Sequence, residues 1–129
     1  VVLLLGNGLR AIPEDQRSAL ETLYESTNGS GWKRNDHWME DSDPCDALRP
    51  WYGLSSELGQ PCTEASGVEI ISFIANNLVG TLPDVFQVFD RLQKISLEDH
   101  FDLTGQFPAS LFLPPQLVSL VVTYAKMGG

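Results

Sequence analysis

Apolar residues return at fixed steps in the second half of the chain, in rows that begin at Val68, Leu92 and Leu117. The period is about 25 residues, which is the length of one supersecondary unit in a repeat protein. The rows are, in order, Val68, Ile71, Phe73, Asn76, Leu78, Gly80, Leu82 and Pro83; Leu92, Ile95, Leu97, His100, Leu103, Gly105, Phe107 and Pro108; and Leu117, Leu120, Val122, Ala125, Met127 and Gly129. The pattern predicts two full repeats and one partial repeat over residues 68–129.

Each row predicts the same local structure. The early apolar positions alternate as in a short strand that buries one face. The Asn76 position then turns the chain, because an asparagine side chain can bond backbone groups that would otherwise stay unpaired inside the stack. Gly80 follows where backbones approach closely, and Phe86 and Phe89 fill the side opposite the strands. No single row can bury its apolar face alone, so neighbouring rows must stack.

Residues 13–26 predict an amphipathic helix ahead of the rows. Pro13 suits the first turn of a helix, and acidic residues follow it at the positive helix end. One apolar stripe is formed by Ala19, Leu20, Leu23 and Tyr24. Gly29 is the expected left-handed residue that closes the helix.

Residues 30–67 show no apolar period, but they contain all three tryptophans, Trp32, Trp38 and Trp51. Large aromatic anchors can hold an irregular segment in place, because each ring buries on the order of 200 Å². We therefore expect this segment to be irregular and ordered.

The two cysteines, Cys45 and Cys62, lie in the same segment. They form no CxxC pair and stand far from both histidines, which favours a disulfide over a zinc site. A disulfide implies an oxidising compartment. Asn28-Gly29-Ser30 is an N-glycosylation sequon, which agrees with secretion. Both signals favour an extracellular or lumenal protein, with Asn28 as the candidate glycosylation site.

Composition narrows the classes of partner. The chain has 129 residues, the size of one domain, and 43% of them are hydrophobic. Its net charge is −9, with 17 acidic and 8 basic residues. Nucleic acids and anionic membranes are bound by clustered lysine and arginine, so neither is an expected partner. No apolar run approaches the ~18 residues of a membrane span.

The rows and the segment before them resemble the plant-type class of leucine-rich repeat proteins, whose repeat pattern is LxxLxLxxNxLxGxIPxxLxxL. The upstream residues resemble the N-terminal cap of that class, with a helix containing "ALETLY", then "TNGSGW", then "DPC", "WYG" and a second cysteine. The match covers roughly residues 13–129. His100 and Ala125 depart from the pattern because asparagine is expected there, and "GLSSELGQP" lengthens the loop between the cysteines.

The resemblance implies an α/β fold. Its parts are a right-handed solenoid with a short parallel sheet on the concave face and a helical N-terminal cap with one disulfide. Residues 13–67 would form the cap and residues 68–129 the repeats. Residues 1–12 would form an N-terminal strap or strand. Within residues 1–12, Val1–Leu5 resembles the end of a signal-peptide core. A degenerate repeat row over these residues is a further alternative.

The outward positions of the predicted strands are the candidate binding surface, because concave solenoid faces bind ligands. They are Ile70, Ser72 and Ile74 in the first row, Lys94, Ser96 and Glu98 in the second, and Ser119, Val121 and Thr123 in the third, with Tyr124 at the strand end. Two interpretations stay open at this point. The face is either a plain solvent-facing sheet or a contact surface for a protein or glycan.

Two acidic groups were weighed as metal sites. Glu98, Asp99, His100 and Asp102 form the first; Glu40, Asp41, Asp43 and Asp46 form the second. A solvated acidic loop is the simpler interpretation of the first, and the second lacks the DxDxDG spacing of a calcium loop. No nucleophile, base and orienting group come together in the sequence. We therefore expect no enzyme, no cofactor and no resident metal.

The sequence thus predicts a secreted or extracellular module that binds a protein or glycan ligand or serves as a scaffold. Because the third row stops at Gly129, we expect the module to be a fragment of a longer protein. The alternative is a structural assembly subunit whose open repeat end stacks on neighbouring chains in a fibre, coat or large complex.

Overall fold

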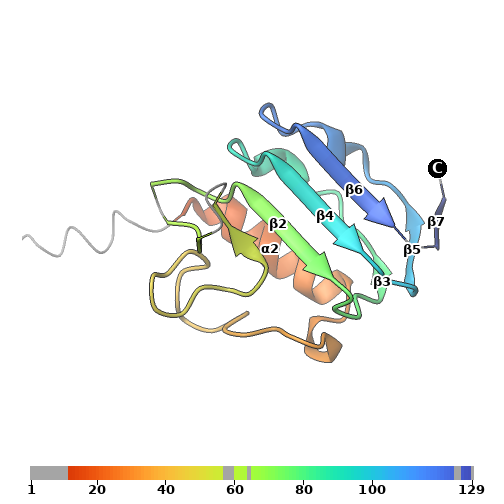
Figure 1. Ribbon diagram of the computed structural model, residues 1–129, viewed down its shortest axis with the longest axis horizontal. Helices are drawn as coiled ribbons and strands as arrows, with labels where there is room; N and C mark the ends of the chain where they lie inside the picture. The colour runs from red at the N-terminus through yellow and green to blue at the C-terminus, as the bar shows by residue number, and fades with distance from the viewer. Residues whose placement is uncertain (1–11, 57–59, 64, 124–125, 129) are drawn as a thin grey trace, which may run out of the picture.

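Three parallel strands, one from each row, form the centre of the molecule (Figure 1). The computed structural model describes residues 12–56, 60–63, 65–123 and 126–128. The predicted strap over residues 1–12 lies outside these ranges, apart from Ile12. Within them, the structure confirms the coarse prediction of a mixed α/β fold with one helix, parallel strands and one disulfide.

The first sheet contains four strands in the order β1-β2-β4-β6. These are β1 (Leu54–Ser55), β2 (Ile70–Ile74), β4 (Lys94–Glu98) and β6 (Ser119–Thr123). The parallel strands pair at equivalent positions of the rows, so that Ile71 lies opposite Ile95, and Ile95 opposite Leu120. This register places the apolar positions of the rows in layers across the core. A slip of one residue would instead turn every side chain of a strand to the other face of the sheet.

The second sheet lies where the predicted Gly-containing segments run. Its strands are β3 (Gly80–Thr81), β5 (Leu103–Gln106) and β7 (Lys126–Gly128), all parallel. Here Gly80 pairs with Leu103, whereas the rows in the sequence align Gly80 with Gly105. The offset is two residues and therefore keeps the same side chains on the same face. Short 3₁₀ helices follow at η2 (Phe86–Val88) and η3 (Ala109–Phe112).

Helix α2 (Glu14–Ser26) begins after Pro13, as predicted, and buries Ala19, Leu20 and Leu23. The predicted left-handed residue is wrong by one position. Asn28 takes that conformation, with φ of 55°, and Gly29 opens the 3₁₀ helix η1 (Gly29–Gly31). Glycine is required at residue 29 for another reason, because a Cβ atom there would lie 2.0 Å from the ring of Tyr24.

The irregular cap segment is held by aromatic rings and the disulfide, as the sequence predicts. The rings of Trp32 and Trp38 lie 4.9 Å apart, and Trp38 lies 4.9 Å from Trp51. Trp32 also contacts Phe73 of β2 at 4.9 Å, which joins the cap to the first repeat. Cys45 and Cys62 form the predicted disulfide. The segment is less irregular than expected, since β1 adds an antiparallel strand to the first sheet.

Polar side chains connect successive layers. Asn76 accepts the Arg34 amide at 2.7 Å and donates to the Arg34 carbonyl at 2.9 Å, which ties the first repeat to the cap. His100 stands at the equivalent place in the second row and bonds backbone groups of the first repeat, as described below. Ala125, the third residue of this set, falls outside the described residues. Within the part of the chain that the structure describes, no helix has the length and apolar character needed to cross a membrane.

Candidate functional site

The outward sheet face consists of the side chains of β2, β4 and β6 that point away from the core. Its members lie in three cross-strand rows: Ile70, Lys94 and Ser119; Ser72, Ser96 and Val121; Ile74, Glu98 and Thr123. The structure therefore brings all the predicted positions together except Tyr124, which lies outside the described residues. Ser55 of β1 pairs with Ile70 and extends the first row by one strand. No pattern in the sequence indicates this additional strand.

Exposure differs sharply among these positions. Ile74 is 55% exposed, and Lys94 is also exposed. Ser96 is only 2% exposed, so the prediction that it is available on the surface is wrong. It lies on the middle strand between Ser72 and Val121, and its hydroxyl donates to the Glu98 carboxylate at 2.5 Å. Ser96 is therefore buried on the middle of the three strands, with its hydroxyl already bonded to Glu98.

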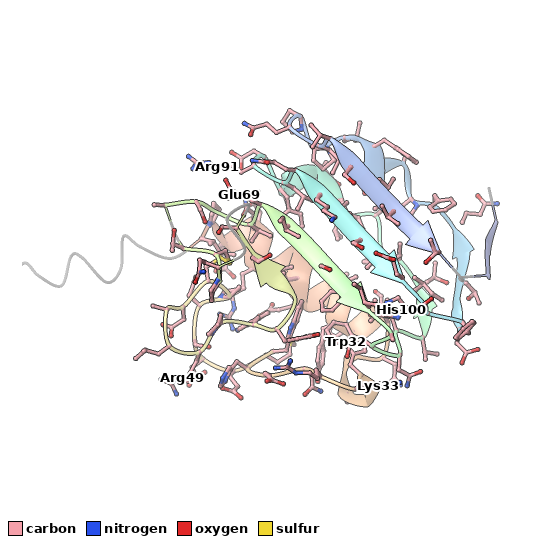
Figure 2. The ribbon with its side chains drawn as sticks, viewed as in Figure 1. Trp32, Lys33, Arg49, Glu69, Arg91 and His100 are labelled. Atoms are coloured by element: carbon pink, nitrogen blue, oxygen red, sulfur yellow. A yellow bond between two sulfur atoms is a disulfide. The ribbon has the colours of Figure 1, made fainter. Side chains whose placement is uncertain are left out.

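A cavity of about 620 Å³, which we call the turn pocket, opens where β2 and β4 end. It is lined by Lys33 from the cap, Ala75 and Asn77 from the first repeat, and Asp99, Phe101 and Asp102 from the second. Figure 2 shows Lys33 at this end of the molecule, with Glu69 and Arg91 at the opposite end. Three turns that are distant in sequence therefore form one concave site.

The backbone of the turn pocket is firmly held. Ala75 and Asp99 occupy equivalent positions in their repeats, and both have left-handed φ values, 51° and 64°. The Ala75 amide donates to the Glu98 carbonyl at 2.8 Å, and the Asp99 amide donates to the Thr123 carbonyl at 3.0 Å. Each turn is thus bonded to the next repeat. The unusual conformations serve the stacking of repeats, and they also fix the shape of the pocket.

The predicted acidic group at this turn does not assemble as a metal site. His100 is 1% exposed, and both of its ring nitrogens bond backbone groups inside the stack. Its ring nitrogens are therefore engaged by backbone groups, whereas Asp99 and Asp102 line the pocket. Across the described residues, no three histidine, cysteine or acidic side chains come close enough to hold a metal ion.

The second acidic group has structural roles in the cap. Asp43 accepts the amides of Ile12 and Cys45 at 3.0 and 2.9 Å. Asp46 accepts the amides of Arg49 and Leu48, and these bonds hold the pKa of its carboxyl below the usual value. The carboxylates of Asp43 and Asp46 are therefore engaged in shaping the loop.

A smaller cavity of about 330 Å³ lies in the cap beside β1, and Tyr52 and Arg34 are among its lining residues. The guanidinium carbon of Arg34 lies 4.1 Å from the centre of the Tyr52 ring. Arg34 also forms an ion pair with Asp36 at 2.8 Å, which lowers the pKa of the Asp36 carboxyl. The cation of this cavity is thus already satisfied within the chain. Asn28, the predicted glycosylation site, is exposed, and its modification stays a prediction.

Comparison with known proteins shows a likeness in fold to a solved structure. No protein-family model matches the sequence, and no curated protein matches it. Among solved structures, the chain is similar to the leucine-rich repeat ectodomain of the receptor kinase SOBIR1 from Arabidopsis thaliana, with a TM-score of 0.58 and 16% sequence identity. The chain resembles a leucine-rich repeat ectodomain in fold. The likeness covers 91% of this chain and 57% of that ectodomain, so the leucine-rich-repeat-like fold here spans little more than half the length of its neighbour.

Proposed function

We propose that this chain is an extracellular leucine-rich repeat module, and that its outward sheet face binds a protein or glycan ligand. The register of the three parallel strands carries the proposal. It brings the outward positions of successive rows side by side on one face of the sheet, which would be the concave face of a right-handed solenoid. The Cys45–Cys62 disulfide supports an oxidising compartment, and the SOBIR1 likeness supports the solenoid architecture.

The composition of the face suits a contact surface. Ile74 and Val121 supply apolar area, while Lys94 and Glu98 supply charges of both signs. Protein interfaces combine an apolar centre with polar groups at the rim. The three rows give a surface that is mixed in this sense, and every one of these side chains stands on a strand whose backbone is held by pairing.

The test compares variants of matched chemistry. Wild-type chain, the double variant Ile74→Ser with Val121→Ser, and the control Leu48→Ser would be immobilised and exposed to secreted proteins and to a panel of oligosaccharides. Leu48 is an exposed aliphatic residue in the cap loop, so the control removes apolar surface elsewhere. We expect ligands that bind wild type and the control to lose affinity for the double variant. Equal binding by all three proteins, or no ligand from either source, would contradict the proposal.

The alternative function, assembly through the repeat end, is supported by a different observation. Phe112, Leu113 and Val118 are exposed apolar side chains near β6, and Val118 is 83% exposed. Leu120 and Val122 of β6 are only half-buried. A second copy of the chain would cover this end. Size-exclusion chromatography with light scattering tests this assembly. Polymers that grow with the concentration of the wild-type chain, and that do not form in the Val118→Asp variant, would support assembly. A wild-type monomer at all concentrations would exclude it.

A further inference from the structure

The turn that follows helix α2 contains two polar side chains that the fold does not use. Asn28 and Ser30 are both exposed, and Asn28 has a left-handed backbone with φ of 55°. Asn28 forms no side-chain capping bond at η1. Among the residues that the structure describes, neither its amide group nor the Ser30 hydroxyl has a hydrogen-bond partner. The left-handed backbone favours an asparagine at residue 28, but it makes no demand on residue 30.

The other asparagines in the described part of the chain behave differently. Asn35 donates to the Gly29 carbonyl at 3.0 Å, and Asn77 donates to the Gly31 carbonyl at 3.1 Å. Asn76 bonds backbone groups of the cap, as described above. Each of these amides holds the main chain in place. Asn28 thus differs from them in keeping its amide available to chemistry from outside the chain.

The backbone of this turn is fixed by groups other than the two exposed side chains. The carbonyls that accept Asn35 and Asn77 belong to the residues on either side of Ser30. Within the turn, the Gly31 amide donates to the Asn28 carbonyl at 2.9 Å. A substituent on the Asn28 amide would therefore leave every one of these bonds in place.

Glycine at residue 31 keeps the space beside the Asn28 amide open. A Cβ atom on Gly31 would lie 2.7 Å from the Nδ2 atom of Asn28. A larger residue there would press on the atom to which a sugar is joined in an N-glycosylated protein. The sequon Asn28-Gly29-Ser30 is therefore presented on an exposed turn with room around its acceptor atom.

We propose that Asn28 carries an N-linked glycan. The donor is an oligosaccharide held on a lipid pyrophosphate, and the acceptor atom is Nδ2 of Asn28. A bond forms between Nδ2 and the first sugar carbon, the bond from that carbon to the pyrophosphate oxygen breaks, and Nδ2 loses one proton. The Ser30 hydroxyl completes the N-x-S/T acceptor that the transferring enzyme recognises.

This inference rests on the extracellular location in the proposed function, because the transfer takes place in the secretory pathway. It concerns a different surface, since Asn28 and Ser30 lie in the turn after α2 and contribute nothing to the strands of the outward sheet face. Figure 1 shows α2 behind β2. A branched glycan at the end of this helix would keep protein partners off the cap turn and leave the outward sheet face open.

The test produces the full chain behind a cleavable secretion signal in mammalian cells, and intact mass gives the fraction that carries a glycan. Two variants keep Asn28 and change only its sequon. Ser30→Ala removes the hydroxyl and should abolish the glycan, whereas Ser30→Thr keeps the hydroxyl and should raise the occupied fraction. Because Ser30 forms no bond in the fold, both variants should match enzymatically deglycosylated wild type in thermal unfolding.

A second measurement places the sugar. Peptide-N-glycosidase in ¹⁸O water should release the glycan from the folded wild-type chain, because Asn28 is exposed. The enzyme converts the Asn28 amide to a carboxylate that carries ¹⁸O, and mass spectrometry of peptides locates the label. We expect the label at residue 28 in wild type and in Ser30→Thr, and none in Ser30→Ala.

Two results would overturn the inference. They are a wild-type chain that is secreted without a glycan, and a glycan that persists in Ser30→Ala. In the first case a formed Cys45–Cys62 disulfide would leave the proposed extracellular module standing. The same two cysteines recovered as free thiols would count against the proposed location itself, so the two failures are distinguishable.

Discussion

The ring nitrogen Nε2 of His100 lies 2.7 Å from the carbonyl oxygen of Phe73 and donates to it, while Nδ1 accepts the Leu78 amide at 3.2 Å. The two backbone groups belong to the previous repeat and lie on opposite sides of the ring. Asn76 performs the same task in the first row for the backbone of Arg34 alone. The two ring nitrogens of His100 thus reach two residues of the previous repeat, Phe73 at the end of β2 and Leu78 after the turn.

His100 should make stability depend on pH. Burial lowers the pKa of His100 below its usual value of 6.5, against the opposing effects of the Phe73 carbonyl and Asp99. The neutral ring fits the site because Nδ1 faces a donor. The unfolded chain therefore binds the proton more readily, so stability is fully present above about pH 6.5 and falls as pH drops below it. Chemical denaturation between pH 7.5 and 5 measures this loss, and His100→Asn should remove most of it.

At pH 7.5, two substitutions of His100 should differ in how much they lower the free energy of unfolding. His100→Ala leaves the buried Leu78 amide without a partner and should cost about 2–3 kcal/mol of unfolding free energy. His100→Asn keeps one of the two bonds and should cost about half as much. Equal destabilisation by both variants, or none by either, would show that the ring does not join the repeats.

Gly80 and Gly105 should differ in their response to alanine. A Cβ atom on Gly80 would lie 2.5 Å from the backbone oxygen of Ser26, and φ there is 120°. A Cβ atom on Gly105 would instead meet the Thr81 side chain at 2.7 Å, with φ of 87°. Backbone yields less than a side chain, so we expect Gly80→Ala to cost about 3 kcal/mol and Gly105→Ala about half of that. Thermal unfolding of both variants measures which one loses more stability. A larger loss in Gly105→Ala than in Gly80→Ala would contradict the close approach of Gly80 to Ser26.

Ser110 joins the second repeat to the first on the side opposite the strands. Its hydroxyl oxygen accepts the buried Phe86 amide at 3.1 Å, and its own amide donates to Asp84 at 3.0 Å. Hydrogen bonds from the Ser110 hydroxyl and amide lower the pKa of the Asp84 carboxyl. Ser110→Ala should destabilise the fold by about 1–2 kcal/mol, the cost of one unpaired buried amide.

The same variant should raise the pKa of Asp84 toward its usual value. The carboxyl ¹³C signal of Asp84, followed from pH 6 to 2, measures the change. In wild type the Asp84 contribution is present above about pH 4 and is lost as pH falls through the lowered pKa. An unchanged Asp84 titration in Ser110→Ala would mean that the bond between the repeats is not formed.

The disulfide should contribute to the cap. Closing a loop of this length lowers the entropy of the unfolded chain by an amount equivalent to about 3 kcal/mol. Cys45→Ala with Cys62→Ser should lower the unfolding free energy by about that amount and should expose Trp51, whose ring is fully buried. Tryptophan fluorescence during denaturation reports both effects. Full retention of stability in the double variant would show that the disulfide does not stabilise the fold.

The repeat rows could be predicted because their spacing is local information. The pairing of Ile71 with Ile95, and of Ile95 with Leu120, follows from the alignment of the rows. The helix and the disulfide follow from patterns of equally short range. These features depend on the spacing of residue types along the chain, which can be read directly from the sequence.

The turn pocket could not be predicted in this way. It needs Lys33 of the cap beside Asp99 of the second repeat, and no spacing rule joins residues so far apart. The two-residue strand β1 is too short to produce a pattern. The burial of Ser96 goes with its place on the middle strand and with the Glu98 hydrogen bond, which alternation along one strand does not reveal. His100 was grouped with nearby acids because its contacts are with distant backbone.

The central claim is that successive repeats stack with their strands in one register. Nuclear Overhauser cross-peaks between backbone protons of neighbouring strands test it most directly. We expect contacts of parallel strands that place Ser72 beside Ser96 and Ser96 beside Val121. Cross-peaks that pair Ser72 with Leu97, or that follow an antiparallel pattern between β2 and β4, would contradict it.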